Sequence, residues 1–454
     1  MKNLYSLALC FLAATAVSFA RAAVSGTWKV DDLSLGLLER LLPGLVFGAA
    51  MALTAWRYLA ALRSAGTATL TPALLGGVLL VHLAAAAALP LTSNDLFSNL
   101  AYGRITLLGG NPYLLGPAAL PTEDPFAHLV GQRWRDTPIV YGPIAATLAA
   151  LPARLGHVGR SLLAFKAMLL ALSLTSVLIA YRFSRRLPPE RATYAFLLFG
   201  LSPLLIWEVS AQAHNDGLMV LALCGFVGAA LAGEEWAALV CLAAALYSKF
   251  AVAPLLLLYV WVVARRSPVR AVLMLIAVAA IGALLFAPYW QGFATLRGPG
   301  AALGADAIRT NRSFADLFYW CAKPLGASAQ LWSYRLAYGA GIVLLIGLGI
   351  RALRQTRTAT DVIHHGLLIF LVYDLVAAPY FQPWYLTWLL PLALAHPDHR
   401  WQQLVARYTA LSTVQYILPI DPVLPVALNL VILRDLRALQ WEGTTKSVAY
   451  PSLH

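Results

Sequence analysis

The chain has 454 residues, of which 60% are hydrophobic and 12% are charged, and its mean hydropathy is +0.72. This composition excludes an ordinary soluble globular protein and predicts an all-α, polytopic membrane protein. The net charge of +13 would suit a nucleic-acid-binding protein. The basic residues, however, fall mostly in short connections between apolar runs, where the positive-inside rule places them, so we expect no nucleic-acid partner.

The N-terminal residues 1–23 combine a basic start, an apolar centre and small residues at their end. This pattern is typical both of a cleaved signal peptide and of a signal anchor that remains as a first membrane helix, and we favour the anchor. Apolar runs of about 17–25 residues then recur to the end of the chain, each long enough to cross a hydrocarbon core of about 30 Å. They predict one membrane-embedded domain over residues 1–454 with about 13 transmembrane helices.

A polar, glycine-rich and aromatic stretch, SNDLFSNLAYGRITLLGGNPYLLGP at residues 93–117, directly follows the apolar run 73–91. Such a long polar connection in a multi-span protein indicates a functional loop, and we interpret residues 92–160 as an external loop with interfacial helices. Within it, the apolar segment 141–155 would extend only about 22 Å as a helix. We expect this segment to lie in the outer interface rather than to span the membrane.

The arginines predict which connections face the cytoplasm. Arg57 and Arg63, the sequence YRFSRRLPPER at 181–191 and the arginine clusters at 265–270 and 351–357 are expected there. The opposite, external face then receives the polar and aromatic segments 92–160, 211–217, 248–250, 288–330 (a second external loop) and 379–385. The chemistry of the protein is therefore expected at the external face.

Several residues of these external segments also have plainer interpretations. Asp95 could simply cap the helix that follows it, and the triplet at 214–216 could cap the next apolar run. Lys249 could snorkel from a helix end to the interface. Trp384 and Tyr385 could belong to an aromatic belt. A lysine at an external boundary is contrary to the positive-inside rule, however, and a phosphate partner would explain it.

The order of several short motifs resembles that of the polyprenyl-phosphate-sugar-dependent glycosyltransferases with the GT-C fold, most of all the bacterial alpha-1,6-mannopyranosyltransferases. In chain order the motifs are Ser93 with Asp95, the group Gly110, Pro112, Tyr113, Gly116 and Pro117, the tripeptide Tyr141-Gly142-Pro143, the tripeptide His214-Asn215-Asp216, the boundary lysine Lys249 and the pair Trp384-Tyr385. The chain departs from the family pattern at Asn94, where an arginine is often found, and it lacks glycines before His214.

The resemblance implies an inverting glycosyltransferase that moves a hexose, mannose above all, from a polyprenyl-phosphate donor to a glycan, glycolipid or protein acceptor. It places the reaction at the periplasmic or external face of a bacterial inner membrane, within a multi-pass, GT-C-like fold. In this interpretation Asp95 is the general base, and Lys249, Arg312 and Arg104 are the candidates that could stabilise the departing phosphate. The substrate-binding residues that it implies are Arg104, Asn111, Tyr113, Tyr141, His214, Asn215, Asp216, Lys249, Arg312, Gln382, Trp384 and Tyr385.

The sequence requires no cofactor. Some enzymes with the GT-C fold use a divalent metal, and Asp95 with Asp216, or Glu123 with Asp124, could supply oxygen ligands to Mg²⁺ or Mn²⁺. The motifs do not distinguish mannose from glucose, galactose or arabinose, nor one class of acceptor from another.

Two other functions use similar features and are kept as alternatives. A transporter or flippase of lipid-linked glycans would place ionisable residues and broken helices near the middle of the membrane, usually in two related halves. The chain shows no such duplication. An O-antigen ligase or polymerase would be expected to carry its largest loop late in the chain, whereas here the richest loop comes early.

Overall fold

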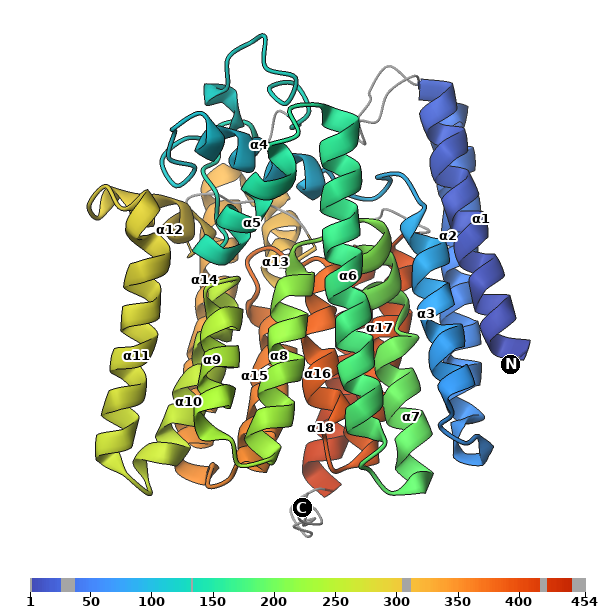
Figure 1. Cartoon of the computed structure of the whole chain (residues 1–454), viewed down its shortest axis with the longest axis vertical. Helices are drawn as coiled ribbons and strands as arrows, with labels where there is room; N and C mark the ends of the chain where they lie inside the picture. Colours follow the sequence, from blue (N-terminus) through green and yellow to red (C-terminus); the bar gives the residue numbers. More distant parts are fainter. Residues whose placement is uncertain (1, 26–36, 132–133, 304–311, 417–422, 443–454) are drawn as a thin grey trace.

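The computed structural model describes residues 2–25, 37–131, 134–303, 312–416 and 423–442, and the regular elements in these ranges are helices (Figure 1). The prediction of an all-α protein is therefore confirmed. The α-helices are α1 Lys2–Ser25, α2 Leu37–Arg63, α3 Pro72–Ala86, α4 Asp95–Leu107, α5 Pro143–Ala153, α6 Val158–Ser184, α7 Pro189–Gly200, α8 Asp216–Leu231, α9 Glu235–Leu246, α10 Ala253–Ala264, α11 Pro268–Phe286, α12 Arg297–Leu303, α13 Phe314–Cys321, α14 Ala327–Gln355, α15 Ala359–Val372, α16 Leu389–Leu394, α17 His399–Ser412 and α18 Val423–Glu442.

Six of the described helices are long and apolar enough to cross a membrane. They lie at Leu4–Ala23, Pro43–Arg63, Val158–Ser184, Pro268–Tyr289, Ala327–Gln355 and Ala359–Ala377, and a seventh span results if α7 and the segment Leu205–Ala211, which meet at 47°, are counted as one. Five shorter apolar helices accompany them. The protein is thus a multi-pass membrane protein, while the number of about 13 crossings stays a prediction.

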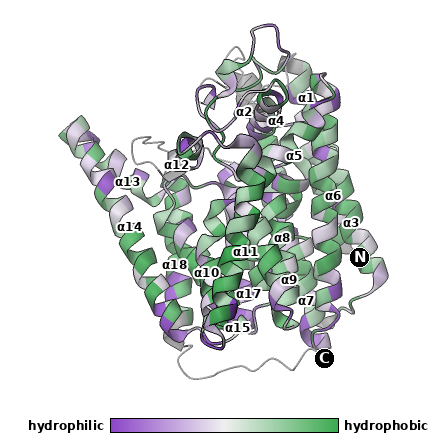
Figure 2. Cartoon of the chain, turned by 60° about the vertical axis from the view of Figure 1, so that its left-hand side comes forward, coloured by the Kyte–Doolittle hydropathy of each residue, from purple (hydrophilic) through white to green (hydrophobic). Residues whose placement is uncertain are grey.

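Apolar residues cover much of the helical bundle, as Figure 2 shows. The long helix α14 leaves most of its surface free of contact with the rest of the chain, since only 11% of its apolar window is buried. An uncovered apolar helix of this kind fits contact with lipid. Residues 2–23 form most of α1, which packs along α2 and α3 (Figure 1). Whether this segment is retained as an anchor stays a prediction.

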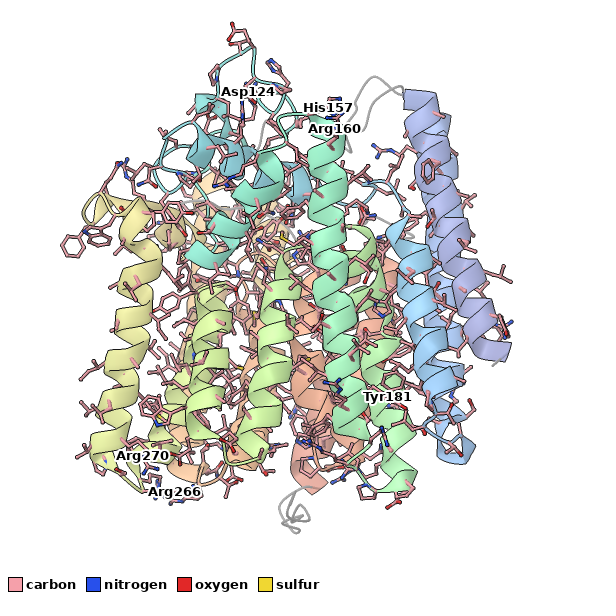
Figure 3. The ribbon with its side chains drawn as sticks, viewed as in Figure 1. Asp124, His157, Arg160, Tyr181, Arg266 and Arg270 are labelled. Carbon is pink, nitrogen blue, oxygen red and sulfur yellow. The ribbon has the colours of Figure 1, made fainter. Side chains whose placement is uncertain are left out.

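The bundle has two chemically different ends. Asp124, His157 and Arg160 lie at one end, which we call the loop end because α4 and α5 are found there (Figures 1 and 3). Arg266 and Arg270 lie at the other, which we call the arginine end (Figure 3). The separation agrees with the one that the arginine pattern predicts, and the side of the membrane that each end faces stays a prediction.

Close backbone contacts hold the helices of the loop end together. A Cβ at Gly103 of α4 would lie 2.3 Å from the carbonyl oxygen of Ala149 in α5, so only a glycine permits this approach. At the start of α5 the amide of Gly142 donates to the carbonyl oxygen of Ser248, at 3.0 Å. A Cβ at Gly142 would lie 2.0 Å from the carbonyl oxygen of Tyr247. The first loop is therefore attached directly beside Lys249.

Two π-helical segments reach toward the same region. They are Leu205–Ala211, which carries Glu208, and Tyr373–Ala377, which carries Asp374. Wide turns of this type occur frequently at functional sites, because they change the direction in which side chains point. The 3-10 segment Pro383–Trp388 follows the second one and contributes three large aromatic residues.

Candidate functional site

Asp95 is the first residue of α4, and its carboxylate faces two polar groups from distant parts of the chain. Its Oδ2 atom accepts a hydrogen bond from the Tyr141 hydroxyl at 3.3 Å and lies 3.4 Å from Nδ1 of His214. The side chain keeps an exposed fraction of 26%. Asn94, at the N-cap position, makes no capping hydrogen bond through its side chain. Asp95 is thus engaged in contacts that helix capping alone would not require.

His214 lies between two carboxylates. Its Nε2 atom is 3.1 Å from Oε2 of Glu208, on the side of the ring opposite the contact with Asp95, and the ring stacks on Trp384 at 4.0 Å between centroids. The preceding residue, Ala213, has a φ of 58°, a left-handed conformation that helps to direct this turn inward.

The two carboxylates determine the charge of the imidazole. Burial opposes protonation of His214, but the interactions with Asp95 and Glu208 outweigh it and raise the pKa of His214 to about 9. Burial likewise opposes ionisation of Asp95, yet His214, and additionally Lys249 and Ser93, lower the pKa of Asp95 below its usual value. At neutral pH the arrangement therefore contains an imidazolium beside an ionised Asp95.

Lys249 forms a second buried ion pair. Its Nζ atom lies 2.6 Å from Oδ1 of Asp216, and the same oxygen accepts a hydrogen bond of 2.5 Å from the Trp388 indole. The ammonium is 5.0–5.3 Å from the ring centroids of Tyr141, Tyr385 and Trp388, within the range of cation–π attraction. With a total exposure of 8%, Lys249 does not snorkel to water, and Asp216 holds its ammonium inside the protein.

Two further predicted residues approach from later loops. Arg312 places its Nη1 atom 3.5 Å from Oε1 of Gln382, and its charge also acts on Glu208. Arg312 has a φ of 65°, which a non-glycine residue rarely adopts and which the surrounding structure must hold in place. These contacts link the second loop to the segment around Trp384.

Other predicted residues support this arrangement from behind. Asn111 donates to the carbonyl oxygen of Tyr289 at 2.6 Å, and Tyr113, which is fully buried, donates through its hydroxyl to the carbonyl oxygen of Tyr141 at 3.1 Å. Asn215 donates to Asn99 at 3.1 Å, and Asn99 in turn donates to the carbonyl oxygen of Asp95 at 2.8 Å. The three predicted residues are therefore fixed by backbone and side-chain partners.

Arg104 is not brought to this group. It follows Asp95 on α4 by nine residues, or about 13 Å along a helix axis, and its Nε atom lies 2.6 Å from Oδ2 of Asp124. Each acidic pair considered for metal binding thus contains a member that a cation already holds, Asp124 by Arg104 and Asp216 by Lys249. Among the described residues, no group of three or more His, Cys, Asp or Glu side chains is suited to a metal ion.

The sequence interpretation missed Glu208 and Trp388. Glu208 was visible as an acidic residue in an apolar run, and Trp388 follows Trp384 by four residues, which is about one helical turn. Both carboxylate oxygens of Asp374, Oε1 of Glu208 and Oδ2 of Asp216 are buried without a hydrogen-bond partner in the described part of the chain, while Oε2 of Glu208 contacts His214.

Multi-pass membrane proteins with buried charged groups gathered at one end of the bundle include both membrane-bound transferases and transporters. The comparison with family models separates them: the model of the alpha-(1->6)-mannopyranosyltransferase N-terminal domain matches residues 5–265, more than half of the chain. The chain therefore belongs to the alpha-(1->6)-mannopyranosyltransferase family, as its motifs predicted.

Individual relatives agree with this assignment. The chain is 25% identical over 352 residues to alpha-(1->6)-mannopyranosyltransferase A of Mycobacterium tuberculosis, an alignment that covers 71% of this chain and 65% of the relative. It is 31% identical over 153 residues to a Mycolicibacterium smegmatis protein named "Probable alpha-(1->6)-mannopyranosyltransferase", covering 33% of this chain and 26% of that protein. The chain thus spans less than two thirds of the length of both relatives.

Proposed function

We propose that the protein is an inverting glycosyltransferase that moves mannose from a polyprenyl-phosphate donor to a hydroxyl group of a glycan, glycolipid or protein acceptor. The observation that carries this proposal is the environment of Asp95, a carboxylate that is partly exposed, ionised and held between Tyr141 and the His214 imidazolium. A group in this state is able to accept a proton from an acceptor hydroxyl.

In the proposed reaction, the acceptor hydroxyl binds beside Asp95 and attacks the anomeric carbon from the face opposite the phosphate. The new glycosidic bond forms, the bond to the phosphate oxygen breaks, Asp95 takes the proton, and polyprenyl phosphate leaves, so the configuration inverts. His214 is a positioning residue that holds Asp95 through its contact with Glu208. Lys249 and Arg312 are the cations that oppose the charge developing on the phosphate.

The buried acceptors fit a sugar substrate. Hydroxyl groups of a pyranose can donate to Oδ2 of Asp216, Oε1 of Glu208 and the carboxylate oxygens of Asp374. The rings of Trp384 and Tyr385 provide apolar faces for sugar or prenyl carbon atoms. Arg104, Asn111, Tyr113 and Asn215 would then act on the substrate indirectly, by holding α4 and its loop in place.

For the membrane, we place the loop end at the external or periplasmic face of a bacterial inner membrane and the arginine end in the cytoplasm. The shorter apolar helices would complete a GT-C-like bundle of about 13 crossings. The donor would then enter from the outer leaflet, and the interfacial position of α5 would bring the loop to the lipid surface.

The test is an assay of the purified protein with polyprenyl-phosphate mannose, glucose, galactose and arabinose, and with a nucleotide sugar as a comparison. We expect transfer of mannose from the lipid donor alone, and a loss of about 10²–10⁴-fold in turnover for Asp95→Asn. Glu123→Gln, an exposed acidic residue of the same loop, is the matched control and should retain activity. Full turnover by Asp95→Asn would remove Asp95 as the base.

Metal dependence is measured in the same assay. We propose transfer without a cofactor, because Lys249 and Arg312 supply positive charge where a Mg²⁺ or Mn²⁺ ion would otherwise be needed. Activity should therefore survive EDTA, and restoration of a lost activity by Mg²⁺ or Mn²⁺ would establish a metal requirement instead.

A flippase remains the second candidate, because Glu208 and Asp374 are buried carboxylates on π-helical segments. It predicts movement of the lipid-linked sugar across a liposome membrane in the absence of any acceptor. Transfer without such movement would exclude it.

A further inference from the structure

A hollow at the arginine end lies far from the candidate site, between α2, α7 and α17. It has a volume of about 390 Å³, and its wall includes Arg63 at the end of α2, Glu190 at the start of α7 and His399 at the start of α17. Arg191 fixes this corner of the bundle, since its guanidinium donates to the carbonyl oxygen of His396 at 2.7 Å. The hollow is therefore built by three packed helices rather than by a loose loop.

The polar groups around the hollow favour an anion. Arg63 and Arg407 both line it and both are exposed, and Arg63 makes no ion pair within the described ranges. Within the described ranges, Arg407 forms one ion pair, in which its Nη1 atom lies 3.5 Å from Oδ2 of Asp435 in α18. Among the described residues, Glu190 is the only acidic one in the wall. Two guanidinium groups that line one space are a typical arrangement for binding phosphate.

The apolar part of the hollow adjoins the lipid-facing surface of α2. Leu59 and Leu62 line the hollow itself, while Leu53 and Trp56, one to two turns earlier, are exposed on the outside of the bundle. The guanidinium of Arg57 lies 4.4 Å from the centroid of the Trp56 ring, a pairing typical of the boundary between hydrocarbon and headgroups. The hollow is thus at the depth of the headgroups, with arginines above an apolar wall.

A second, smaller hollow of about 220 Å³ lies on the other side of Arg407. Arg400 and Asp435 line it together with Leu404 and Leu439, and Arg407 borders both spaces. The same combination of guanidinium and leucine side chains therefore occurs twice around one helix, α17.

We propose that the larger hollow binds the phosphate group of an anionic phospholipid, with Arg63 and Arg407 holding the phosphate and Leu59 and Leu62 contacting the glycerol and first acyl carbons. Basic pockets between membrane helices at an arginine-rich face recognise such headgroups. Inorganic phosphate shares the charge but not the apolar contact, so it should bind far more weakly. This site is separate from the proposed transfer reaction and does not depend on it.

The test measures lipid binding to the full-length protein in a neutral detergent by native mass spectrometry. The probes are phosphatidylglycerol, cardiolipin, zwitterionic phosphatidylethanolamine and inorganic phosphate. We expect the two anionic lipids to remain bound. Equal retention of phosphatidylethanolamine, or binding of inorganic phosphate with the same affinity as the lipids, would overturn the proposal.

Three variants locate the binding. Arg63→Gln combined with Arg407→Gln should weaken phosphatidylglycerol binding about 25-fold, or roughly fivefold for each arginine. Glu190→Gln removes the only acidic residue of the wall and should strengthen binding several-fold, a gain that misfolding would not produce. Arg270→Gln, an exposed arginine at the same end that is paired with Glu235 at 2.8 Å, is the matched control. An equal loss in this control, or no gain in Glu190→Gln, would show that general surface charge attracts the lipid and that the hollow does not.

Discussion

The loop end and the arginine end of this bundle both carry many charges, but they use them in opposite ways. At the loop end, ion pairs join segments far apart in the chain and exclude water, as Lys249 with Asp216 does at 10% and 1% side-chain exposure. At the arginine end, the pairs are exposed and several are local, as between Arg400 and Asp398 or Arg434 and Asp435.

This difference indicates at which end of the bundle the functional residues lie. Exposed ion pairs contribute little to stability, and positive charges at one end are sufficient to orient a membrane protein. Buried charges lose their hydration and are retained only where something compensates for that loss. The charges of the loop end therefore need an explanation beyond folding, and the charged donor that we propose would supply one.

The largest effect on stability is expected from breaking the buried pair. Lys249→Met leaves Asp216 buried without its cation and should lower the free energy of unfolding by about 3–5 kcal/mol. Arg270→Met breaks the exposed pair with Glu235 at the arginine end and should lower it by less than about 1 kcal/mol. Thermal unfolding in detergent compares the two.

The double variant Lys249→Met with Asp216→Leu tests the reason for that loss. Replacing both charges by apolar side chains removes the unpaired carboxylate, so much of the stability should return while transfer remains lost. If Lys249→Met and Arg270→Met lowered the free energy of unfolding by the same amount, the contrast between buried and exposed ion pairs would be wrong.

A pH-dependent effect of similar or smaller size is expected from His214. Its pKa is raised from 6.5 to about 9 in the folded protein. The protonated ring therefore stabilises the folded state fully below pH 6.5, and this stabilisation is lost as the pH rises through about 9. The difference corresponds to roughly 3 kcal/mol. The melting temperature should therefore fall between pH 6.5 and 9 in the wild type.

His214→Gln is the control for this titration, because glutamine keeps polar contacts but does not titrate. Its melting temperature should be lower near neutral pH and should change much less over the same interval. A wild-type profile that is flat between pH 6.5 and 9 would contradict a protonated His214 and leave Asp95 without its cation.

The sequence predicted the helical class and the gathering of Asp95, His214, Asp216, Lys249 and Trp384 at one end, because hydrophobic runs and basic connections define spans and ends. It did not predict the partners. Arg104 lies in the same loop as Asp95 but points to Asp124, since residues nine apart on a helix are separated along its axis. Lys249 meets Asp216 because of how α8 and the segment around Lys249 are rotated and placed within the bundle. The hydrophobic periodicity of the sequence does not specify this placement.

The smallest effect tests the close packing that brings the loop to Lys249. Gly142→Ala would place a Cβ 2.0 Å from the backbone oxygen of Tyr247, so the start of α5 must shift, with a loss of about 1–3 kcal/mol and reduced transfer. Gly76→Ala is the matched control within α3, where a Cβ would meet nothing within 4 Å. It should raise stability by up to about 1 kcal/mol, since alanine favours a helix over glycine. Thermal unfolding and the mannose transfer assay measure the two effects. If Gly142→Ala retains both stability and activity, the close contact of α5 with Tyr247 is not needed for the site. The loop end would then be less tightly packed than its buried charges imply.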